Sequence, residues 1–437
     1  MGIVENPWQT RFKGLNSLDN IRARVEVRPD VIDGLEKEPG GVVEVEVGMA
    51  LSRIYRPSAQ ELWILLYLLE RSMGHAKLAY SDREKYAGRL YSPIYDTASS
   101  SPAVCLLGPA GVGKSQLAKA FLRLMPDDCT IDVDHHKNIP LQGAWLVTAN
   151  PHESVIQSLV PFLGQGEADM RKAGHAVVLK AAAAIAYRNG LSHILVDEMQ
   201  FMVGSDRTTR ITKTLLDLRQ LGVPFVYIAN HSLWRSLSKS HAQIAQRLLA
   251  NPLQLCPDPP DSEDWTGYLM ECSRVLCSYL DEDLALRATP IFDMTAGLKR
   301  FVVLLLQGAF RIAWNQRKRR VAWPHIIASY HSPQYCISRE QVEMALNKYE
   351  KSKRQIDYES PVAMSGEQAR GVEDARAKYT ERVMANRALV SAVPVGEQCA
   401  LPEIDLQPSP KRVPRPKAPP RTVHSLIDSA SRLRRRI

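Results

Sequence analysis

Long apolar runs are missing from this chain of 437 residues. No stretch approaches the roughly 18 uncharged apolar residues that mark a membrane-spanning helix, and the N-terminus carries no apolar segment of the signal-peptide type. The sequence therefore predicts neither a membrane span nor secretion. Hydrophobic residues still make up 45% of the chain, an ordinary share for a protein that buries a packed core.

Paired cysteines are also missing. No two cysteines lie at C-x-x-C spacing and no histidines follow at zinc-finger distance, so the sequence suggests neither a metal-binding cysteine site nor a disulfide framework. A reducing bacterial cytoplasm fits this pattern best. Internal repeats, nuclease-type carboxylate clusters and nucleophile triads are not visible either. The seven scattered cysteines are Cys105, Cys129, Cys256, Cys272, Cys277, Cys336 and Cys399.

Basic and acidic residues nearly balance over most of the chain. Nine basic residues and one acid lie between Lys411 and Arg436, so this segment carries +8 of the net charge of +9. A basic tail predicts an arm for nucleic acid or for an acidic partner surface, and a solubilising linker is the alternative. From about residue 355 the chain is polar and then Pro-rich, so we expect it to be disordered until bound.

The middle of the chain alternates short apolar runs with helical patterns. This alternation predicts an α/β fold with a parallel sheet, whose ligands bind at the carboxyl ends of the strands. The expected strands are 103–107, 144–148, 193–197 and 224–229, and the expected helices are 114–124, 153–163, 168–188 and 208–221. Residues 262–350 show amphipathic stretches at 264–280, 297–315 and 338–350 without a convincing strand, which predicts a helical lid.

Four regions follow from these patterns. Residues 1–55 form an N-terminal arm or small appendage, 56–255 the core, 256–352 the helical lid and 353–437 the basic tail. Within the arm, residues 42–47 alternate in a β-like manner. A helix is expected over 58–80, with Ser58 available as its N-cap.

A phosphate-binding loop is the most specific motif in the chain. It has the G-x-x-x-x-G-K-[ST] pattern, follows an apolar strand and opens a helix, which is the context that the motif requires. Backbone N–H groups of such a loop surround phosphates, Lys114 reaches the β- and γ-phosphates, and the Ser115 hydroxyl ligates Mg²⁺. The sequence therefore predicts that ATP and Mg²⁺ are bound by Gly108, Pro109, Ala110, Gly111, Val112, Gly113, Lys114, Ser115 and Gln116.

A second apolar run, 194–196, ends in Asp197 and Glu198. An acid at the carboxyl end of the strand adjacent to the loop's own strand can hold Mg²⁺ through water, which suits Asp197. Its neighbour Glu198 can orient and deprotonate the attacking water. Such a run alone is weak evidence, but together with the phosphate loop it predicts nucleotide hydrolysis.

Three further residues are candidates for the γ-phosphate. Asn230 ends the next strand, the position called sensor 1 in AAA+ ATPases, although asparagine is also a common turn former. Arg300 closes a G-x-x-R pattern that begins at Gly297 and resembles sensor 2, with an exposed helix arginine as the alternative. Arg247 is a candidate arginine finger for a neighbouring subunit, with Arg235 as its competitor.

Other charged clusters point less clearly to a function. Arg207, Arg210 and Lys213 lie at helical spacing and could read a DNA backbone, although an exposed helix face is the alternative. The run 132–136 has metal-ligand residue types, but we interpret it as a surface loop because no further ligand is spaced to join it. The run 317–320 could contact phosphates or simply end a helix in solvent.

Taken in order, these motifs resemble those of an AAA+ ATPase, and more narrowly of the TnsC/TniB transposition regulators. Residues 194–200 resemble that family's "ILVIDEIQ", residues 222–229 its "GIPLVLIGT" and residues 295–300 its "TSGIIRRL". Residues 247–253 followed by Trp265 are similar to its "RRF..L.L….W". The resemblance covers roughly residues 55–350, and within it only the ATPase motifs are individually specific.

The resemblance implies a protein that forms a homo-oligomeric ring or filament on double-stranded DNA when ATP is bound. It would link a target selector of the TnsD/TniQ type to a transposase of the TnsB type, and ATP hydrolysis would disassemble it. The sequence departs from the family in its N-terminal arm, its long basic tail and the Ala229-Asn230 pair that replaces Gly-Thr. The alternatives are a replication initiator or helicase loader, and a STAND-type signalling NTPase.

Overall fold

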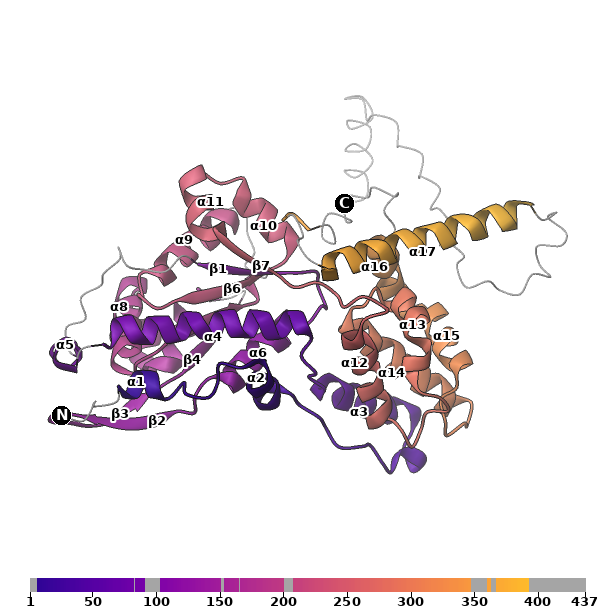
Figure 1. The fold of residues 1–437 in the computed structure, drawn as a ribbon, viewed down its shortest axis with the longest axis horizontal. Helices are drawn as coiled ribbons and strands as arrows, with labels where there is room; N and C mark the ends of the chain where they lie inside the picture. The colour runs from indigo at the N-terminus through magenta and orange to yellow at the C-terminus, as the bar shows by residue number, and fades with distance from the viewer. Residues whose placement is uncertain are drawn as a thin grey trace, which may run out of the picture. The chain divides into compact units, whose positions relative to one another are not determined.

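A computed structural model of the chain describes residues 6–81, 83–90, 103–150, 153–164, 166–199, 207–346, 360–362 and 367–392 (Figure 1). Contacts divide the chain into residues 1–380 and residues 381–437. Apart from the end of one long helix, the described residues belong to the first unit. Within the described residues, no helix combines the length and apolar character needed to cross a bilayer.

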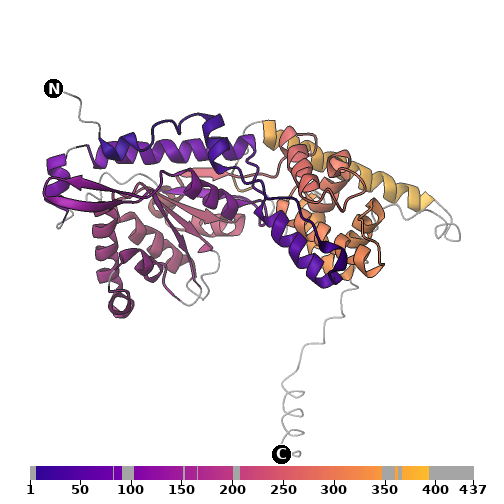
Figure 2. The ribbon, with the colours of Figure 1, turned by 90° about the horizontal axis from the view of Figure 1, so that it is seen from below.

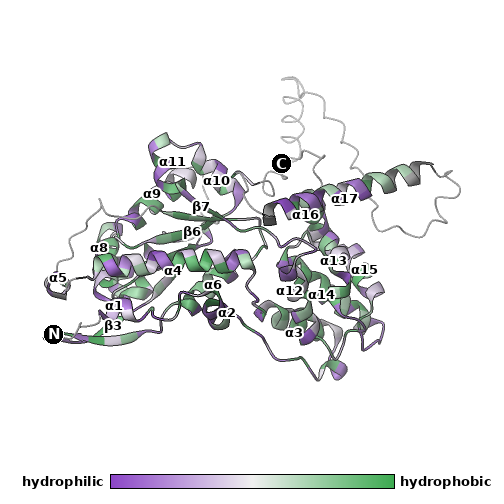
Figure 3. Cartoon of the chain, viewed as in Figure 1, coloured by the Kyte–Doolittle hydropathy of each residue, from purple (hydrophilic) through white to green (hydrophobic). Residues whose placement is uncertain are grey.

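A five-stranded parallel sheet forms the centre of the core. Its strands lie in the order β4-β5-β6-β1-β7. Their bounds are Val104–Leu107 for β1, Ala144–Thr148 for β4, His193–Asp197 for β5, Phe225–Ala229 for β6 and Asn251–Gln254 for β7. The four predicted strands are confirmed, and Figure 3 shows the hydrophobic character of the sheet. The expected adjacency was wrong, because β6 lies between β1 and β5.

Side chains alternate across the strands and build a core on each face of the sheet. Cys105, Ile194 and Tyr227 belong to a buried cluster that also takes in residues of α8 (His175–Arg188) and α9 (Arg207–Arg219). On the other side, α2 (Leu18–Val25), α4 (Ala59–Ala79) and α6 (Lys114–Leu124) contact one another, and α6 contacts β4 and β5. Figure 2 shows helices on both faces of the sheet.

Several local predictions needed correction. The helix expected over 168–188 is two helices, α7 (Glu167–Lys172) and α8, separated at Ala173 and Gly174. The helix expected over 153–163 is a 3₁₀ segment, Gln157–Leu163, with Pro161 inside it. Residues 132–136 belong to an antiparallel hairpin of β2 (Cys129–Val133) and β3 (His136–Leu141), which the sequence analysis missed. The remaining core helices are α5 (Arg83–Arg89), α10 (His231–Ser238) and α11 (Ala242–Leu249).

The N-terminal segment is helical throughout its described elements. After α1 (Pro7–Thr10) and α2, residues Gly40–Arg53 form α3, so the strand predicted for 42–47 was wrong. Val43, Val47 and Leu51 are buried at helical spacing, and α3 packs against α14. Burying this helical stripe outweighs the β preference of the valine-rich sequence. The helix predicted over 58–80 is confirmed as α4, and Ser58 and Glu61 form its capping box.

The residues predicted as a helical lid are helical as far as Leu346, with α14 at their centre. Its helices are α12 (Glu263–Val275), α13 (Ala288–Thr295), α14 (Lys299–Asn315), α15 (Trp323–His331) and α16 (Cys336–Leu346), with 3₁₀ turns at Leu284–Arg287 and Pro333–Tyr335. An isolated bridge joins Leu280 and Val321, the one β pairing among the described lid residues. The part of the predicted last helix beyond residue 346 lies outside the described residues.

The expected disorder after residue 355 was wrong for one segment. Residues Glu367–Ala392 form the long helix α17. Its residues Val372, Ala375 and Tyr379 are buried, at spacings that place them on one helical face. An apolar stripe of three residues within a polar sequence therefore docks the first half of α17. The basic segment from Lys411 to Arg436 lies outside the described residues.

Candidate nucleotide-binding site

The phosphate loop connects β1 to α6, as the motif predicts. A Cβ on Gly108 would lie 2.6 Å from the backbone oxygen of Leu255, so no side chain fits there without moving the backbone. Gly113 has a φ of +117°, which residues with a side chain rarely adopt, and it immediately precedes α6. The loop therefore presents its backbone N–H groups at a helix N-terminus, an arrangement that favours anions.

Lys114 is the buried charge of this loop. Its Nζ donates to the carbonyl oxygens of Gly108 and Pro109, both at 2.8 Å. Burial lowers the pKa of Lys114 to about 8, although Asp197 and Glu198 act to raise it. A cation that loses hydration in this way is stabilised by a nearby anion. The loop thus holds a partly desolvated ammonium group next to its own carbonyls.

Asp197 and Glu198 stand at the carboxyl end of β5, as predicted. The Asp197 side chain is buried and its Oδ1 accepts from the Glu198 backbone N–H at 2.7 Å. Glu198 has a φ of +62°, a strained conformation for a residue with a Cβ. Burial and the neighbouring Asp197 raise the pKa of Glu198, and Lys114 and Arg300 oppose the rise. A carboxylate with a raised pKa is a stronger base.

Asn230 follows β6, which lies between β1, the strand of the phosphate loop, and β5, the strand that ends in Asp197. Its Oδ1 accepts from the Leu233 backbone N–H at 2.9 Å and from the Ser232 hydroxyl at 3.0 Å, so the side chain caps α10. The position fits sensor 1, but its amide oxygen is committed to the helix cap. Any contact to a nucleotide would therefore come from the amide nitrogen.

Arg300 comes to the phosphate loop from the lid. Its backbone N–H donates to the Gly111 carbonyl oxygen at 3.4 Å. A Cβ on Gly111 would lie 3.2 Å from the Cβ of Arg300. The Arg300 side chain is exposed, and its charge opposes the rise in the pKa of Glu198. The lid therefore places the exposed Arg300 beside the phosphate loop and the acidic end of β5.

Two other loop residues lie at the same site. Ser115 is half-buried in the first turn of α6, where its hydroxyl is one residue from Lys114. Gln116 donates from Nε2 to the backbone oxygen of Ser52 at 3.4 Å, which connects α6 to the end of α3.

The remaining candidates lie at the surface. Arg247 is exposed on α11, and Arg235 is half-buried on α10. Arg210 and Lys213 are exposed on α9, whereas the side chain of Arg207 lies outside the described atoms. The structure does not test the roles predicted for these residues, so they stay predictions.

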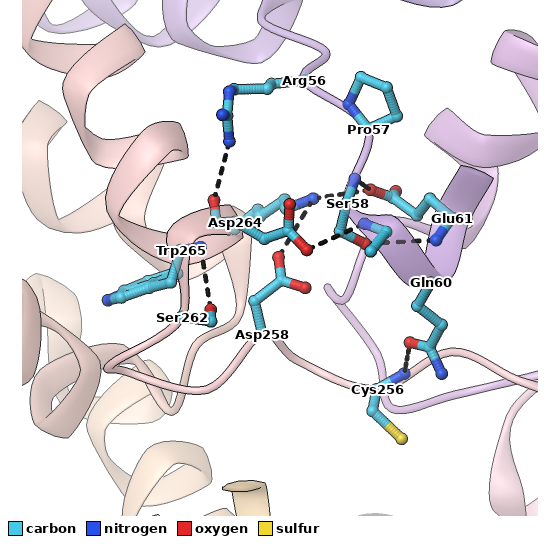
Figure 4. Close-up of polar contacts among 12 residues, drawn as sticks. Arg56, Pro57, Ser58, Gln60, Glu61, Cys256, Asp258, Ser262, Asp264 and Trp265 are labelled. Carbon is cyan, nitrogen blue, oxygen red and sulfur yellow. Dashed lines mark hydrogen bonds and ion pairs between the residues drawn. The ribbon is translucent and has the colours of Figure 1, made fainter. Parts of the chain in front are cut away.

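A charged cluster beside this site was not found from the sequence. Lys299 Nζ lies 3.1 Å from Glu61 Oε2 and 3.7 Å from Asp258 Oδ2. Figure 4 shows Asp258 and Asp264 directed toward the start of α4, where Ser58 and Glu61 lie. The signal in the sequence was Glu61, the acid three residues after the N-cap Ser58. Its partner Lys299 lies within the G-x-x-R pattern itself, directly before Arg300.

The donor set fits a nucleoside triphosphate with Mg²⁺. A glycine cradle, a helix N-terminus and a buried lysine suit phosphate groups, and a serine hydroxyl with a buried aspartate suits a hard divalent cation. Among the described residues, no group of three or more metal-binding side chains forms a separate metal site.

The strand order decides the fold. A phosphate-loop strand separated from the acidic strand by one further strand, followed by a helical lid whose Arg300 contacts the loop, fits the P-loop AAA+ architecture. The chain has the AAA+ fold. No protein-family model matches it, and no curated protein does.

Solved structures similar to this chain include ORC and Cdc6p proteins. ORC2 of Aeropyrum pernix, solved as ADPNP and ADP complexes, shares 15% identity with a TM-score of 0.41, over 71% of this chain and 94% of that one. ORC1 of the same organism, solved with DNA, shares 19% identity with a TM-score of 0.35, over 60% and 66%. Cdc6p of Pyrobaculum aerophilum shares 13% identity with a TM-score of 0.37, over 72% and 80%. Similarity at this level is low, so the fold assignment rests on the strand order and the loop.

Proposed function

We propose that this chain is an ATP-hydrolysing switch of the AAA+ class that assembles on double-stranded DNA and regulates transposition. The observation that carries the ATPase part is the convergence of Lys114, Glu198 and Arg300 at one end of the sheet. These three groups come from the loop, the acidic strand end and the lid. Together they supply a phosphate-binding cation, a base and a second cation.

Each residue has a defined task in this proposal. Lys114 leaves the loop carbonyls to bind the β- and γ-phosphates, and Glu198 orients the attacking water and takes its proton. Ser115 and Asp197 would hold Mg²⁺, which neutralises phosphate charge when bound. Arg300 stabilises charge on the γ-phosphate from the lid side. Because Arg300 belongs to the lid, the phosphate state of the nucleotide is coupled to the lid's position.

The DNA and transposition parts rest on the resemblance to TnsC/TniB regulators and on two surface features. Arg210 and Lys213 are exposed on the same stretch of α9, where they can contact a phosphate backbone. Arg247 is exposed on α11 and is our candidate for completing the site of a neighbouring subunit. In this proposal a TnsD/TniQ-type selector triggers assembly, and a TnsB-type transposase is recruited.

The replication-initiator alternative uses the same ATPase motifs. It predicts a winged-helix domain after the lid. In the described residues beyond 346, the regular structure is the single helix α17. A helicase partner found by copurification would favour this alternative over the transposition regulator.

DNA binding by the full chain tests the proposal. Binding of a duplex should require ATP or a non-hydrolysable analogue and should be weak with ADP or in Lys114→Ala. Affinity should also fall with salt in proportion to the number of phosphates contacted. A chain ending at Pro410 separates the contribution of the basic tail. If DNA affinity does not depend on the nucleotide and is lost in the chain ending at Pro410, electrostatic attraction by the tail explains the binding. The proposed ATP-dependent assembly on DNA would then be wrong.

A further inference from the structure

The start of α4 is one place where the core and the lid are connected. Gln60 donates from Nε2 to the Gln254 backbone oxygen at 2.7 Å and accepts from the Cys256 N–H at 2.9 Å. The Ala59 N–H donates to Asp264 Oδ2 at 2.9 Å. These contacts join one helical turn to the core–lid connection and to α12 of the lid (Figure 4).

Lys299 connects α14 to that turn. Its ammonium group contacts Glu61 at 3.1 Å and Asp258 at 3.7 Å, and it also lies 5.7 Å from the ring centre of Tyr268. The side chains of Glu61 and Asp258 are 2% and 5% exposed, whereas that of Lys299 is 21% exposed. Two buried carboxylates thus depend on one lysine for their charge partner.

The charges in this cluster are strongly coupled. Burial raises the pKa of Asp258 to about 6; Lys299 opposes this rise, and Glu61 and Asp264 add to it. Burial acts to lower the pKa of Lys299, but Glu61 and Asp258 outweigh it and the pKa is raised. Removing one partner from a buried ion pair leaves an uncompensated charge, which is costly. The cluster therefore holds Lys299 firmly in one position.

The next residue after Lys299 is Arg300, at the first turn of α14. Successive side chains on a helix point about 100° apart, so fixing the direction of one fixes the direction of the other. Arg300 also contacts the phosphate loop through its backbone N–H and Gly111. A tilt of α14 that breaks the Lys299 contacts would move Arg300 away from the loop.

We propose that Lys299 is a positioning residue for nucleotide hydrolysis, which holds α14 against Glu61 and Asp258 so that Arg300 stands over the phosphate loop. This inference rests on the ATPase part of the proposed function. Because its ammonium group is held by Glu61 and Asp258, Lys299 acts through Arg300 in this proposal. If Lys299 were only structural, replacing it would lower stability alone. If it positions Arg300, replacing it also lowers turnover.

A double-mutant cycle on the full-length protein tests this. Lys299→Met should lower kcat by about tenfold or more and change KM less than about threefold, because a transition-state contact is lost. Arg300→Ala should do the same, and adding Lys299→Met to it should cause little further loss. Lys119→Met, on the exposed face of α6, is the matched control and should leave kcat unchanged. Losses of kcat that multiply in the double variant would overturn the proposal.

Two further measurements keep the test decisive. If Lys299→Met does not fold, Asp258→Asn replaces it; its smaller loss of kcat should also vanish in the Arg300→Ala background. In nucleotide-free protein, the amide hydrogen-exchange rate around Arg300 reports on how firmly the start of α14 is held. This rate should increase in Lys299→Met but not in Lys119→Met. If the wild type hydrolyses no ATP but this exchange effect is present, the proposed ATPase function fails while the lid-holding role stands. Unchanged exchange overturns the positioning role.

Discussion

The pH dependence of stability is a sharp test of the buried cluster at the lid. Asp258 has a pKa of about 6 in the folded protein, against an ordinary value of 3.8. The folded state therefore binds a proton more readily than the unfolded state. Stabilisation from this proton is fully present below pH 3.8 and is lost as the pH rises through 6.

The size of the effect follows from the two pKa values. Between pH 5 and pH 7.5 the linkage relation gives a loss of about 1.4 kcal/mol of unfolding free energy from this one group. Asp258→Asn keeps the shape of the side chain and removes its titration. The free energy of the variant minus that of the wild type should therefore increase by about 1.4 kcal/mol over the same pH range.

Urea unfolding of both proteins, followed by circular dichroism at a series of pH values, measures this difference. Using the difference cancels every other titrating group that the substitution leaves alone. Asp127→Asn, whose side chain is 93% exposed, controls for the loss of one surface negative charge. A difference between Asp258→Asn and wild type that is flat within about 0.3 kcal/mol, or that decreases with pH, would refute the reasoning.

Three other predictions follow from the site and the fold. Glu198→Gln should keep ATP binding but lower turnover at least about 100-fold, because the base is lost; a nucleotide-binding assay with phosphate release checks this, and normal turnover would remove Glu198 from the mechanism. Gly108→Ala should weaken nucleotide binding, because its Cβ would lie 2.6 Å from the Leu255 oxygen; equal affinity in titration calorimetry would contradict the cradle. Val43→Ala should cost about 2 kcal/mol of unfolding free energy and Val45→Ala less than about 0.5, because they are 0% and 56% exposed; equal losses in denaturant titrations would instead indicate a strand.

The phosphate loop and the acidic strand end were predictable because they depend on local sequence. Glycines at fixed offsets, a lysine and an apolar run ending in acids are imposed by the contacts of a few neighbouring residues. The order of the strands is different, because a motif does not report which strand lies next to it. Thus Asp197 was placed on the strand adjacent to β1, whereas β6 separates the two.

The errors at both ends of the chain have one physical cause. Residues 42–47 alternate like a strand, yet Val43 and Val47 are buried against α14 as parts of a helix. The sequence after 355 looks too polar to fold, yet Val372 and Tyr379 dock α17. In both cases the decisive partner is far along the chain, so a local window carries too little information.

In the proposed function, the charged cluster would favour two discrete positions of the lid over a continuous range. Lys299 and Arg300 are neighbours on α14, but one faces buried carboxylates and the other stands beside the loop and Glu198. At an intermediate tilt of α14, Glu61 and Asp258 would lose their contact with Lys299 without becoming fully hydrated. Buried carboxylates without a partner are unfavourable. Partly tilted lids are therefore disfavoured relative to a lid that is seated or fully released. Binding of a γ-phosphate to Arg300 would then favour the seated lid over the released lid. Any binding surface that includes lid residues would change at the same time.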